Sequence, residues 1–371
     1  MNTAFLVFFG RGGESDVEER LDAVRIAIGA SVIRRAAEAG FDPIAGVTAD
    51  AAAIAAFGGA GATTLAPESE PFHLGTELKS VLVRLNADRV CLIGAGAGAL
   101  LTVEDLRGIR RDLEASEALV LSNNYYSADL VAFGPASALD AIALPATDNP
   151  LPRLLHQQAG LPSHQLARSA ATLLDVDTPA DVTVLVRHPA CPPDLRGLDT
   201  WERELGDRIG ALMRLVTTPD LELLVAGRVG APVWTFLESQ TACRVRMLAE
   251  ERGMQAAGRD IDGSARTALG FLYELSGPPA FFQKMRALGD GMLFDSRVLF
   301  AHLGWRTTPA ERFASDLFDA ASIAAGPLRD FTVAAAGSGF PVLLGGHTLV
   351  SGVLWTMVEA AWSGHPEQEQ G

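Results

Sequence analysis

Polar residues that could do chemistry follow hydrophobic runs in the C-terminal half of the chain. Four such runs predict strands, at 221–226, 243–249, 291–294 and 340–344. Charged side chains and one histidine come just after these runs: Arg228, Glu251, Arg252, Asp295, Arg297 and His347. Because the carboxyl ends of parallel strands share one edge of a sheet, ligands of open α/β sheets bind at that edge.

Arginines and carboxylates at such an edge suit an anionic or phosphorylated ligand, since a guanidinium makes paired hydrogen bonds to an oxyanion. We therefore predict ligand contacts from Arg228 and Glu251, and catalytic roles for Asp295, Arg297 and His347. The alternative interpretation is that strands end in polar loops whatever the function of the protein. The sequence leaves both interpretations open.

A second candidate site follows the N-terminal hydrophobic run at 4–9, where the chain has a glycine-rich turn: Gly10, Arg11, Gly12 and Gly13. Backbone N–H groups of such a turn can hold phosphates, because they form a concave surface of donors. A tight turn between a strand and a helix explains the same residues equally well. The turn therefore predicts either a phosphate-binding loop or a purely structural connection.

Two aspartates, Asp175 and Asp177, lie in the segment DVDTPADV near the middle of the chain. Carboxylate oxygens are ligands for hard cations such as Mg²⁺. The segment also carries the signals of a helix start, with Thr178 as N-cap, Pro179 at the first helical position and Asp181 closing a capping box. Metal binding and helix capping are both open for the two aspartates.

The composition excludes several classes of protein. The chain has 371 residues, of which 48% are hydrophobic, and a formal net charge of −15. This length and hydrophobic content predict two folded domains and not a disordered chain. The acidic balance disfavours nucleic acids and anionic membranes as partners, because their phosphates must be met by clustered lysine or arginine. No hydrophobic run approaches the length of about 18 residues that a membrane span needs.

The cysteines and the N-terminus favour a cytoplasmic protein. Cys91, Cys191 and Cys243 are odd in number and far apart, so they predict neither a disulfide framework nor a zinc site. The first residues are apolar without a basic leader or a cleavage site, and they predict a first strand in place of a signal peptide.

Strands and helices alternate in the first half of the chain. We expect strands at 4–9, 41–50, 89–94, 118–122 and 130–133, and helices at 17–39, 51–57, 77–85, 103–115 and 151–159. Such alternation forms right-handed βαβ units, so the predicted fold is α/β, with a mostly parallel sheet in a three-layer arrangement.

The second half predicts a helix-rich α/β domain of unknown type. Helices are expected at 201–216, 233–238, 263–276 and 348–362, and Asp316 is expected to face solvent from a helix. The Pro- and Gly-rich stretch that begins at His188 predicts a linker. The predicted domains are residues 1–187 and 200–371, joined by a linker at 188–199.

The predicted first domain resembles the nucleotidyltransferases of GT-A fold, the group that contains molybdenum-cofactor guanylyltransferase, phospholactate guanylyltransferase and CMP-Kdo synthetase. The glycine-rich turn after the first strand is one shared feature. The segment LIGAGAGALLTVEDL at 92–106 is similar to the family's LPCDxPLLTPEDL, and DVDTPADV is similar to its DxDTPEDL. No family is recognised in the second half.

The resemblance implies transfer of a nucleotidyl group from a nucleoside triphosphate to a small phosphorylated or hydroxyl acceptor, with Mg²⁺ as the cation. It assigns the following residues to phosphates, base and metal, in that order: Gly10, Arg11, Gly12 and Gly13; Gly75 and Thr76; Asp177, with Asp175. The same alignment puts Ala97 at the family's metal-binding aspartate, and Glu18 or Glu19 near its phosphate-binding lysine. Since alanine has no oxygen ligand on its side chain, the metal site is degenerate.

Three functions follow from these patterns. The first is a nucleotidyltransferase whose second domain supplies acceptor contacts or the surface of a homodimer. The second is a catalytically inactive nucleotide-binding scaffold or sensor, favoured by the missing aspartate and lysine. The third is an enzyme of the second domain that acts on a phosphorylated metabolite. In each case the expected partner is a small molecule, and neither nucleic acid nor a membrane is expected.

Overall fold

The computed structural model describes residues 2–198 and 201–363, and these form two compact units. The first unit contains the chain up to Gly12, together with Asp22–Asp175 and Pro192–Gly197. The second contains Gly13–Leu21, Val176–Cys191 and the chain from Leu198 onward. Residues 199, 200 and 364–371 of the predicted linker and second domain lie outside the described residues. The domain boundaries at 187 and 199 stay a prediction.

The first unit is built on a seven-stranded sheet with the order β3-β2-β1-β4-β6-β5-β7. Its neighbouring strands are parallel except for β6, which runs antiparallel to β4 and β5. The strands are β1 (Thr3–Phe8), β2 (Ile44–Val47), β3 (Thr63–Leu65), β4 (Arg89–Gly94), β5 (Leu119–Ser122), β6 (Leu130–Gly134) and β7 (Ser163–Gln165). The prediction of an α/β fold with a mostly parallel sheet is confirmed.

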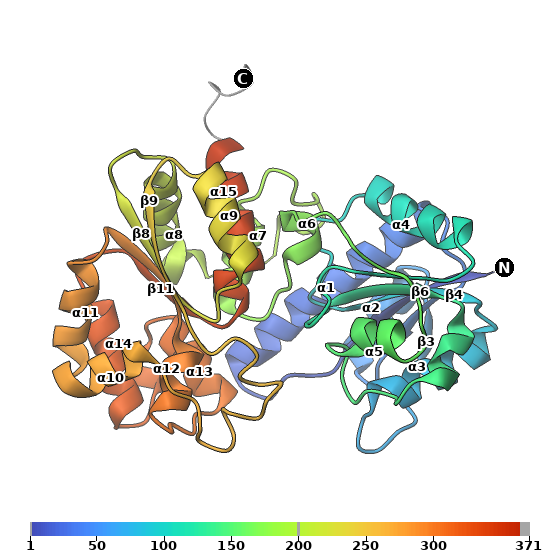
Figure 1. The fold of residues 1–371 in the computed structure, drawn as a ribbon, viewed down its shortest axis with the longest axis horizontal. Coiled ribbons are helices and arrows are strands. Elements are labelled where there is room, and N and C mark those ends of the chain that lie inside the picture. Colours follow the sequence, from blue (N-terminus) through green and yellow to red (C-terminus); the bar gives the residue numbers. More distant parts are fainter. Residues whose placement is uncertain (1, 199–200, 364–371) are drawn as a thin grey trace. The chain divides into compact units, whose positions relative to one another are not determined.

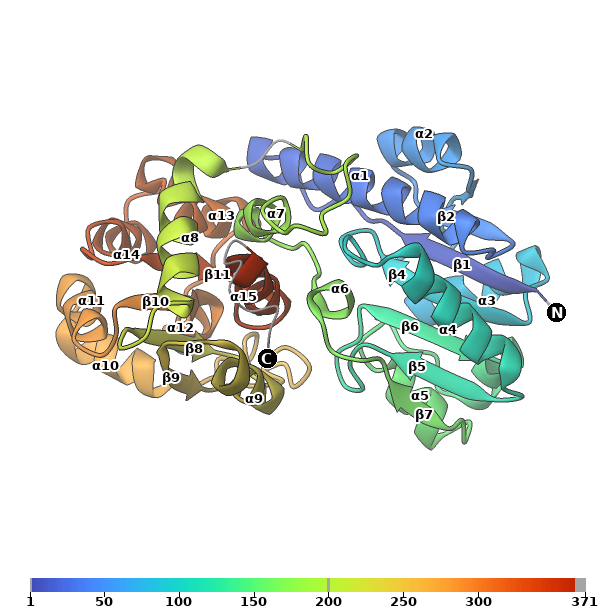
Figure 2. The same ribbon diagram turned by 90° about the horizontal axis from the view of Figure 1, so that it is seen from above.

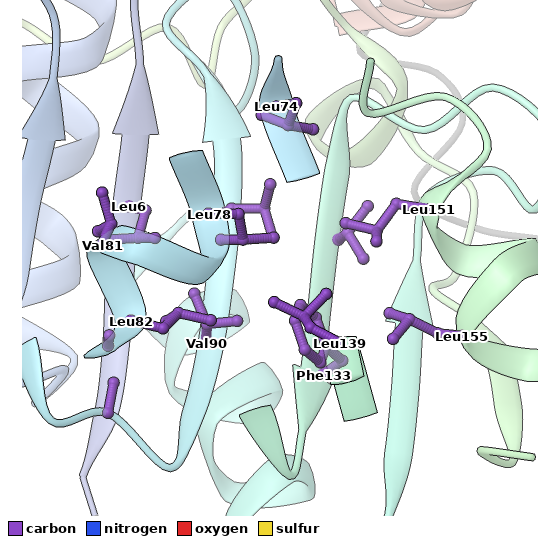
Figure 3. Packing of buried hydrophobic residues seen from close by; sticks show 14 of the residues in the cluster. Leu6, Leu74, Leu78, Val81, Leu82, Val90, Phe133, Leu139, Leu151 and Leu155 are labelled. Atoms are coloured by element: carbon purple, nitrogen blue, oxygen red, sulfur yellow. The ribbon is translucent and has the colours of Figure 1, made fainter. Parts of the chain in front are cut away.

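Helices cover both faces of this sheet, because its strands are apolar on both sides. One face packs under α3 and α5, in a core that includes Leu6, Leu78 and Leu155 (Figure 3). On the other face α4 contacts β1 and β4, as Figure 2 shows. The helices are α1 (Asp16–Glu38), whose first residues belong to the second unit, α2 (Ala51–Gly59), α3 (Leu74–Leu85), α4 (Val103–Ala115), the short 3₁₀ helix η1 (Ala136–Ala141), α5 (Leu151–Gln157) and α6 (Ala170–Leu173).

The second unit is built on a four-stranded, fully parallel sheet with the order β11-β10-β8-β9. Its strands are β8 (Glu222–Gly227), β9 (Arg244–Ala249), β10 (Gly291–Asp295) and β11 (Val342–Gly345). A run of parallel strands joined by helices requires helices on both faces, and β8, β10 and β11 are buried accordingly, whereas β9 is the partly exposed edge strand. The four strands predicted for the second half are confirmed.

Helices flank both faces of the second sheet (Figure 1). One face packs under α10, α11 and α14, in a core that includes Phe281, Phe294 and Phe331. The other face contacts α8 and α9, and α15 packs on α7 and α8. The helices are α7 (Pro179–Leu185), α8 (Glu202–Val216), α9 (Ala231–Gln240), α10 (Ala268–Ser276), α11 (Pro278–Arg286), α12 (Ser296–His302), α13 (Pro309–Asp316), η2 (Ala320–Ser322), α14 (Pro327–Ala336), η3 (Thr348–Val350) and α15 (Gly352–Ser363).

Several predicted element bounds were wrong. The strand expected at 41–50 is limited to Ile44–Val47, because Asp50 instead caps α2 by accepting the Ala53 N–H. The helix expected at 263–276 begins only at Ala268, since Gly263 has a φ of +74° and the preceding residues form turns. None of the described helices has both the length and the apolar character that a membrane crossing requires.

Candidate functional site

The carboxyl edge of the first sheet has its switch point between β1 and β4. The chain proceeds from β1 outward through β2 to β3 on one side, and β4 lies on the other side. Phe8 of β1 pairs with Gly94 of β4, so the loops that follow the two strands begin side by side. Open α/β sheets bind their ligands at such a point.

Two glycines at this edge face open space. Gly10 follows β1 and Gly94 ends β4. Apart from the adjoining residues, no atom of the described residues lies within 4 Å of the position that a Cβ would take at either glycine. Neither residue has a positive φ, so the backbone conformation does not require glycine there. A ligand can therefore approach the backbone closely at both positions.

Carboxylates already contact part of the glycine-rich turn. The Gly12 N–H donates to Asp22 Oδ2 over 2.9 Å, and phosphate binding by Gly12 would require this bond to open. In the second unit, a Cβ added to Gly13 would stand 2.1 Å from Glu18 Oε1. Arg11 is exposed. Because carboxylates and phosphates repel each other, these acids weaken the turn as a phosphate loop.

Gly75 and Thr76 lie in the first turn of α3, which begins three residues earlier than the predicted helix. The Gly75 N–H donates to the Pro145 carbonyl over 2.8 Å, and an added Cβ would stand 2.8 Å from Leu144 Cβ. Thr76 is held by the ring of His73, which accepts its N–H as the helix cap. Close packing therefore accounts for Gly75, and no contact of either residue points to a base.

Asp175 lies beside the residue that replaces the family's aspartate. Asp175 and Ala97 form an isolated antiparallel bridge between their backbones, although 78 positions separate them in the sequence. The structure thereby brings a carboxylate residue next to the loop that lacks one. Nevertheless, the described residues contain no group of three His, Cys, Asp or Glu side chains that could hold a metal ion.

Asp177 belongs to the second unit, where it precedes α7. The predicted capping box is confirmed, since Thr178 and Asp181 hydrogen-bond reciprocally at the start of α7. Asp181 is fully buried and also accepts the Thr348 hydroxyl, which ties this turn to the residues after β11. Burial raises the pKa of Asp181 to about 7, although the Thr178 hydroxyl opposes the shift.

The carboxyl edge of the second sheet has its own switch point, between β8 and β10. The chain passes from β8 to β9 on one side and from β10 to β11 on the other. Arg228 follows β8 and Asp295 ends β10, and they form a two-fold ion pair at this point. The Arg228 Nε donates to Asp295 Oδ2 over 2.6 Å and its Nη2 donates to Oδ1 over 3.0 Å.

The Arg228–Asp295 pair is buried and closely fitted. Asp295 is 0% exposed and Arg228 is 6% exposed. Gly227 has a φ of +125°, and a Cβ there would stand 2.4 Å from Asp295 Cβ, so only glycine lets the two strand ends approach. Burial lowers the pKa of Arg228, but the Asp295 charge outweighs it and the net shift is upward.

The partly buried Arg297 forms a second ion pair, with the buried Asp316. Its Nη1 lies 2.9 Å from Asp316 Oδ1, and its Nη2 also donates to this carboxylate. The expectation that Asp316 faces solvent was wrong, because this residue is 0% exposed. Burial raises the pKa of Asp316, although Arg297 opposes the shift. Both oxygens of Asp316 are engaged with Arg297, so the pair is a structural element beneath the sheet edge.

Glu251 holds its own loop together. Its carboxylate accepts two hydrogen bonds from Arg259, at 2.9 and 2.7 Å, and one from the Arg266 N–H. Arg259 thus outweighs burial and lowers the pKa of Glu251. The neighbouring Arg252 is different, because it is exposed and forms no ion pair or hydrogen bond with any described residue. Ligand contact at this position fits Arg252 better than Glu251.

His347 follows β11 and is partly buried. Its ring forms no hydrogen bond with the described residues, and neither ring nitrogen is among the fully buried unpartnered atoms. Both nitrogens are therefore accessible. Burial and the positive charges of Arg228 and Arg252 lower the pKa of His347, while Asp295 and Asp177 oppose the shift. The imidazole is thus neutral at pH 7 and can accept or donate a proton.

Half of the chain is similar in structure to nucleotidyltransferases. A cytidylyltransferase from Leptospira borgpetersenii serovar Hardjo-bovis is 12% identical, with 50% of this chain and 84% of that chain covered at a TM-score of 0.38. CMP:2-keto-3-deoxy-manno-octonic acid synthetase, complexed with CTP, is 16% identical, with 49% of this chain and 96% of that chain covered at a TM-score of 0.36. A nucleotidyl transferase from Methanothermobacter thermautotroptrophicus is 17% identical, with 47% of this chain and 91% of that chain covered at a TM-score of 0.36.

No protein-family model matches the chain, and no curated protein matches it in sequence. At the identities and TM-scores above, structural similarity decides neither activity nor substrate. The molybdenum-cofactor guanylyltransferase type stays a prediction, as does the cytoplasmic location.

Sequence analysis missed the residues that occupy or complete these two edges. Asp22 lies one helical turn beyond Glu18, which the sequence had marked, and the i, i+4 spacing was the available signal. Arg252 was recognised only as a member of the set after the strands. No sequence pattern marks Asp260, although its buried Oδ1 has no hydrogen-bond partner among the described residues and its charge acts on Arg228.

Proposed function

We propose that the protein is nucleotidyltransferase-like and that its first unit binds a nucleoside triphosphate at the carboxyl edge between β1 and β4. The observation that carries the proposal is the open space at Gly10 and Gly94, at the ends of two adjacent parallel strands. A glycine that neither packing nor φ requires leaves room for a phosphate or sugar close to the backbone.

The residues present do not fit the divalent cation that the family resemblance implies. Ala97 offers no oxygen, and the described residues hold no cluster of metal ligands. Asp22 also places a negative charge on the Gly12 N–H, where a phosphate would otherwise lie. We therefore favour nucleotide binding without a metal-dependent step, as in a scaffold or sensor, and derive no reaction through a metal.

Nucleotidyl transfer to a small phosphorylated or hydroxyl acceptor is the second candidate. Asp175, which bridges Ala97, is the observation that favours it, since a carboxylate from another segment lies beside the degenerate loop. Under this candidate, the protein would release pyrophosphate from a nucleoside triphosphate when a suitable acceptor is present.

Calorimetric titration with ATP, GTP, CTP and UTP, each with Mg²⁺ and with EDTA, tests both candidates. Binding that EDTA leaves unchanged, without pyrophosphate release, supports the scaffold or sensor. Binding that requires Mg²⁺, with pyrophosphate release, supports transfer. The absence of binding by all four nucleotides contradicts the nucleotide proposal.

A matched pair of variants locates the binding. Gly10→Leu fills the open space after β1 and is expected to weaken nucleotide binding by about tenfold or more, the loss of roughly one charged hydrogen bond. Gly108→Leu is the control, because Gly108 lies within α4 and also has no atom within 4 Å of an added Cβ. Equal binding by the two variants would place the nucleotide elsewhere.

A further inference from the structure

We infer that the second unit carries its own binding site for a small phosphate monoester that also bears hydroxyl groups, formed by Arg228, Arg252 and His347. The site goes beyond the nucleotide proposal, because all three residues belong to the second unit and lie on a different sheet. Arg228, Arg252 and His347 come after the carboxyl ends of β8, β9 and β11, respectively.

Arg228 is the buried donor of this site. Its Nε and Nη2 are used by Asp295, and its Nη1 forms no hydrogen bond with any described residue. This Nη1 is not among the fully buried unpartnered atoms, although the residue is only 6% exposed. A guanidinium fixed at two nitrogens, with the third accessible, offers a preorganised donor to an oxyanion.

Arg252 follows β9, the neighbour of β8, and His347 follows β11, the neighbour of β10. The Arg252 Cζ lies 3.7 Å from the position of an added Cβ on Gly230, in the loop that follows Arg228. His347 comes two residues after Gly345, which pairs with Asp295 in the sheet, and Asp295 in turn holds Arg228. The positive charges of Arg228 and Arg252 also act on the His347 ring. Gly230 also begins α9 without a side-chain cap, so the positive end of that ten-residue helix adjoins the same loop.

Two acidic residues that act on the charge of Arg228 bear on the rest of the ligand. Asp177 and Asp260 act electrostatically on Arg228, and Oδ1 of Asp260 is buried without a hydrogen-bond partner. Carboxylate oxygens accept hydrogen bonds, so they suit hydroxyl groups next to the phosphate. They also repel a polyanion. A hydroxylated monoester, such as a sugar phosphate or a glycerol phosphate, satisfies both kinds of neighbour.

Asp295 is a positioning residue of this site. It holds two nitrogens of Arg228 and accepts the Arg228 backbone N–H over 3.2 Å, so it fixes the direction of the remaining nitrogen. The Arg297–Asp316 pair keeps a second arginine away from the ligand, since both of its terminal nitrogens donate to Asp316.

Isothermal titration of the full chain carrying Gly10→Leu tests the inference, because that substitution is expected to weaken phosphate binding at the first unit. The probes are glycerol 3-phosphate, inorganic phosphate and glycerol. We expect glycerol 3-phosphate to bind more tightly than inorganic phosphate, and glycerol alone not to bind. Arg252→Met is expected to weaken glycerol 3-phosphate binding by about tenfold or more. Because Arg252 is exposed and has no partner among the described residues, it can be replaced without loss of folding.

Arg244→Met is the matched control, because Arg244 is an exposed arginine at the opposite, amino end of β9. It should bind glycerol 3-phosphate like the parent protein. Unchanged binding in Arg252→Met, equal losses in both variants, or no binding of glycerol 3-phosphate and phosphate would overturn the site. Equal affinities for the two phosphates would overturn the hydroxylated ligand. Failure of nucleotides to bind the first unit leaves these outcomes unaffected.

Discussion

The carboxyl edges of the two sheets have similar topology but differ in charge: a carboxylate occupies the first edge, and an arginine lies at the second. In each, a switch point lies beside the first strand of the unit, β1 or β8, and a glycine stands at or just after the end of that strand. In the first unit, the donor at Gly12 is met by the carboxylate of Asp22. In the second, Arg228 is held by Asp295 but keeps Nη1 accessible. Topology thus marks where a ligand can bind, and the remaining unpartnered atoms decide what can bind there.

The glycines differ in the same way. Gly227 is required by the fold, because its φ is +125° and Asp295 leaves no room for a Cβ. Gly10 is required by neither packing nor φ. A glycine in a turn after a strand can therefore serve close packing within the protein or an open approach for a ligand, and the sequence does not distinguish the two.

The largest expected effect comes from removing the buried arginine. Arg228→Met leaves the fully buried Asp295 without its partner, so we expect a loss of about 3–5 kcal/mol in the free energy of unfolding. Urea denaturation followed by circular dichroism measures it. Arg203→Met, at an exposed pair with Glu204, should change stability by less than about 1 kcal/mol. Similar losses in the free energy of unfolding for both variants would show that the buried Arg228–Asp295 pair does not stabilise the second unit more than an exposed pair does.

Substitution of the two glycines sharpens the comparison. Gly227→Ala forces a Cβ into Asp295 at an unfavourable φ, and we expect a loss of about 2–4 kcal/mol from the two causes together. Gly10→Ala should change the free energy of unfolding by less than about 0.5 kcal/mol, as for a surface site. The same denaturation experiment measures both. A large loss from Gly10→Ala would mean that the open space is used by the protein itself.

Neutralising the Asp22 carboxylate should make the first edge a better binding site for anions. Asp22→Asn keeps an oxygen acceptor for the Gly12 N–H but removes a negative charge, so we expect nucleoside triphosphates to bind about five- to tenfold more tightly. Titration calorimetry measures the affinity. Asp112→Asn, an exposed change on α4, is the control. Weaker binding in Asp22→Asn would mean that Asp22 supports the nucleotide and does not compete with it.

The smallest expected effect is a pH dependence at the second edge. Because the pKa of His347 lies below its usual value, the free protein has a neutral ring at pH 7. A bound phosphate favours the protonated ring, so affinity should rise by about a few-fold as the pH falls from neutral toward the lowered pKa of His347. His347→Gln should remove this part of the rise. The phosphate itself titrates near pH 6, so titrations of glycerol 3-phosphate at each pH must compare the two proteins directly. If affinity depends on pH in the same way in both proteins, His347 does not contact the phosphate.

The first sheet was predictable from the sequence because its signals are local. The helix at Val103–Ala115 was predicted with its observed bounds, since Thr102 and Asp105 form a capping box within four residues of chain. The capping box at Thr178 is equally local. Alternating strands and helices then predicted the mostly parallel sheet, whereas the order of its strands was not predicted.

The pairing of charges was not predictable, because partners come from distant positions. Arg228 and Asp295 are 67 residues apart, and nothing near either one indicates the other. Asp316 was predicted to face solvent from a helix. It is buried instead, where it pairs with Arg297, nineteen positions earlier in the sequence. The sequence placed Arg297 and Arg228 in one functional set, and only the contacts separate a sequestered guanidinium from an accessible one.

The way the chain is shared between the units limits how the protein can be divided. The second unit takes Gly13–Leu21 from near the N-terminus, where Arg20 stacks 4.4 Å from the buried ring of Trp201. It also takes Val176–Cys191, while Pro192–Gly197 returns to the first. A truncation at any single peptide bond would consequently leave one fragment missing a piece of its interior. Engineers who want either half alone would have to transplant segments, and a nascent chain must be nearly complete before the later half can close.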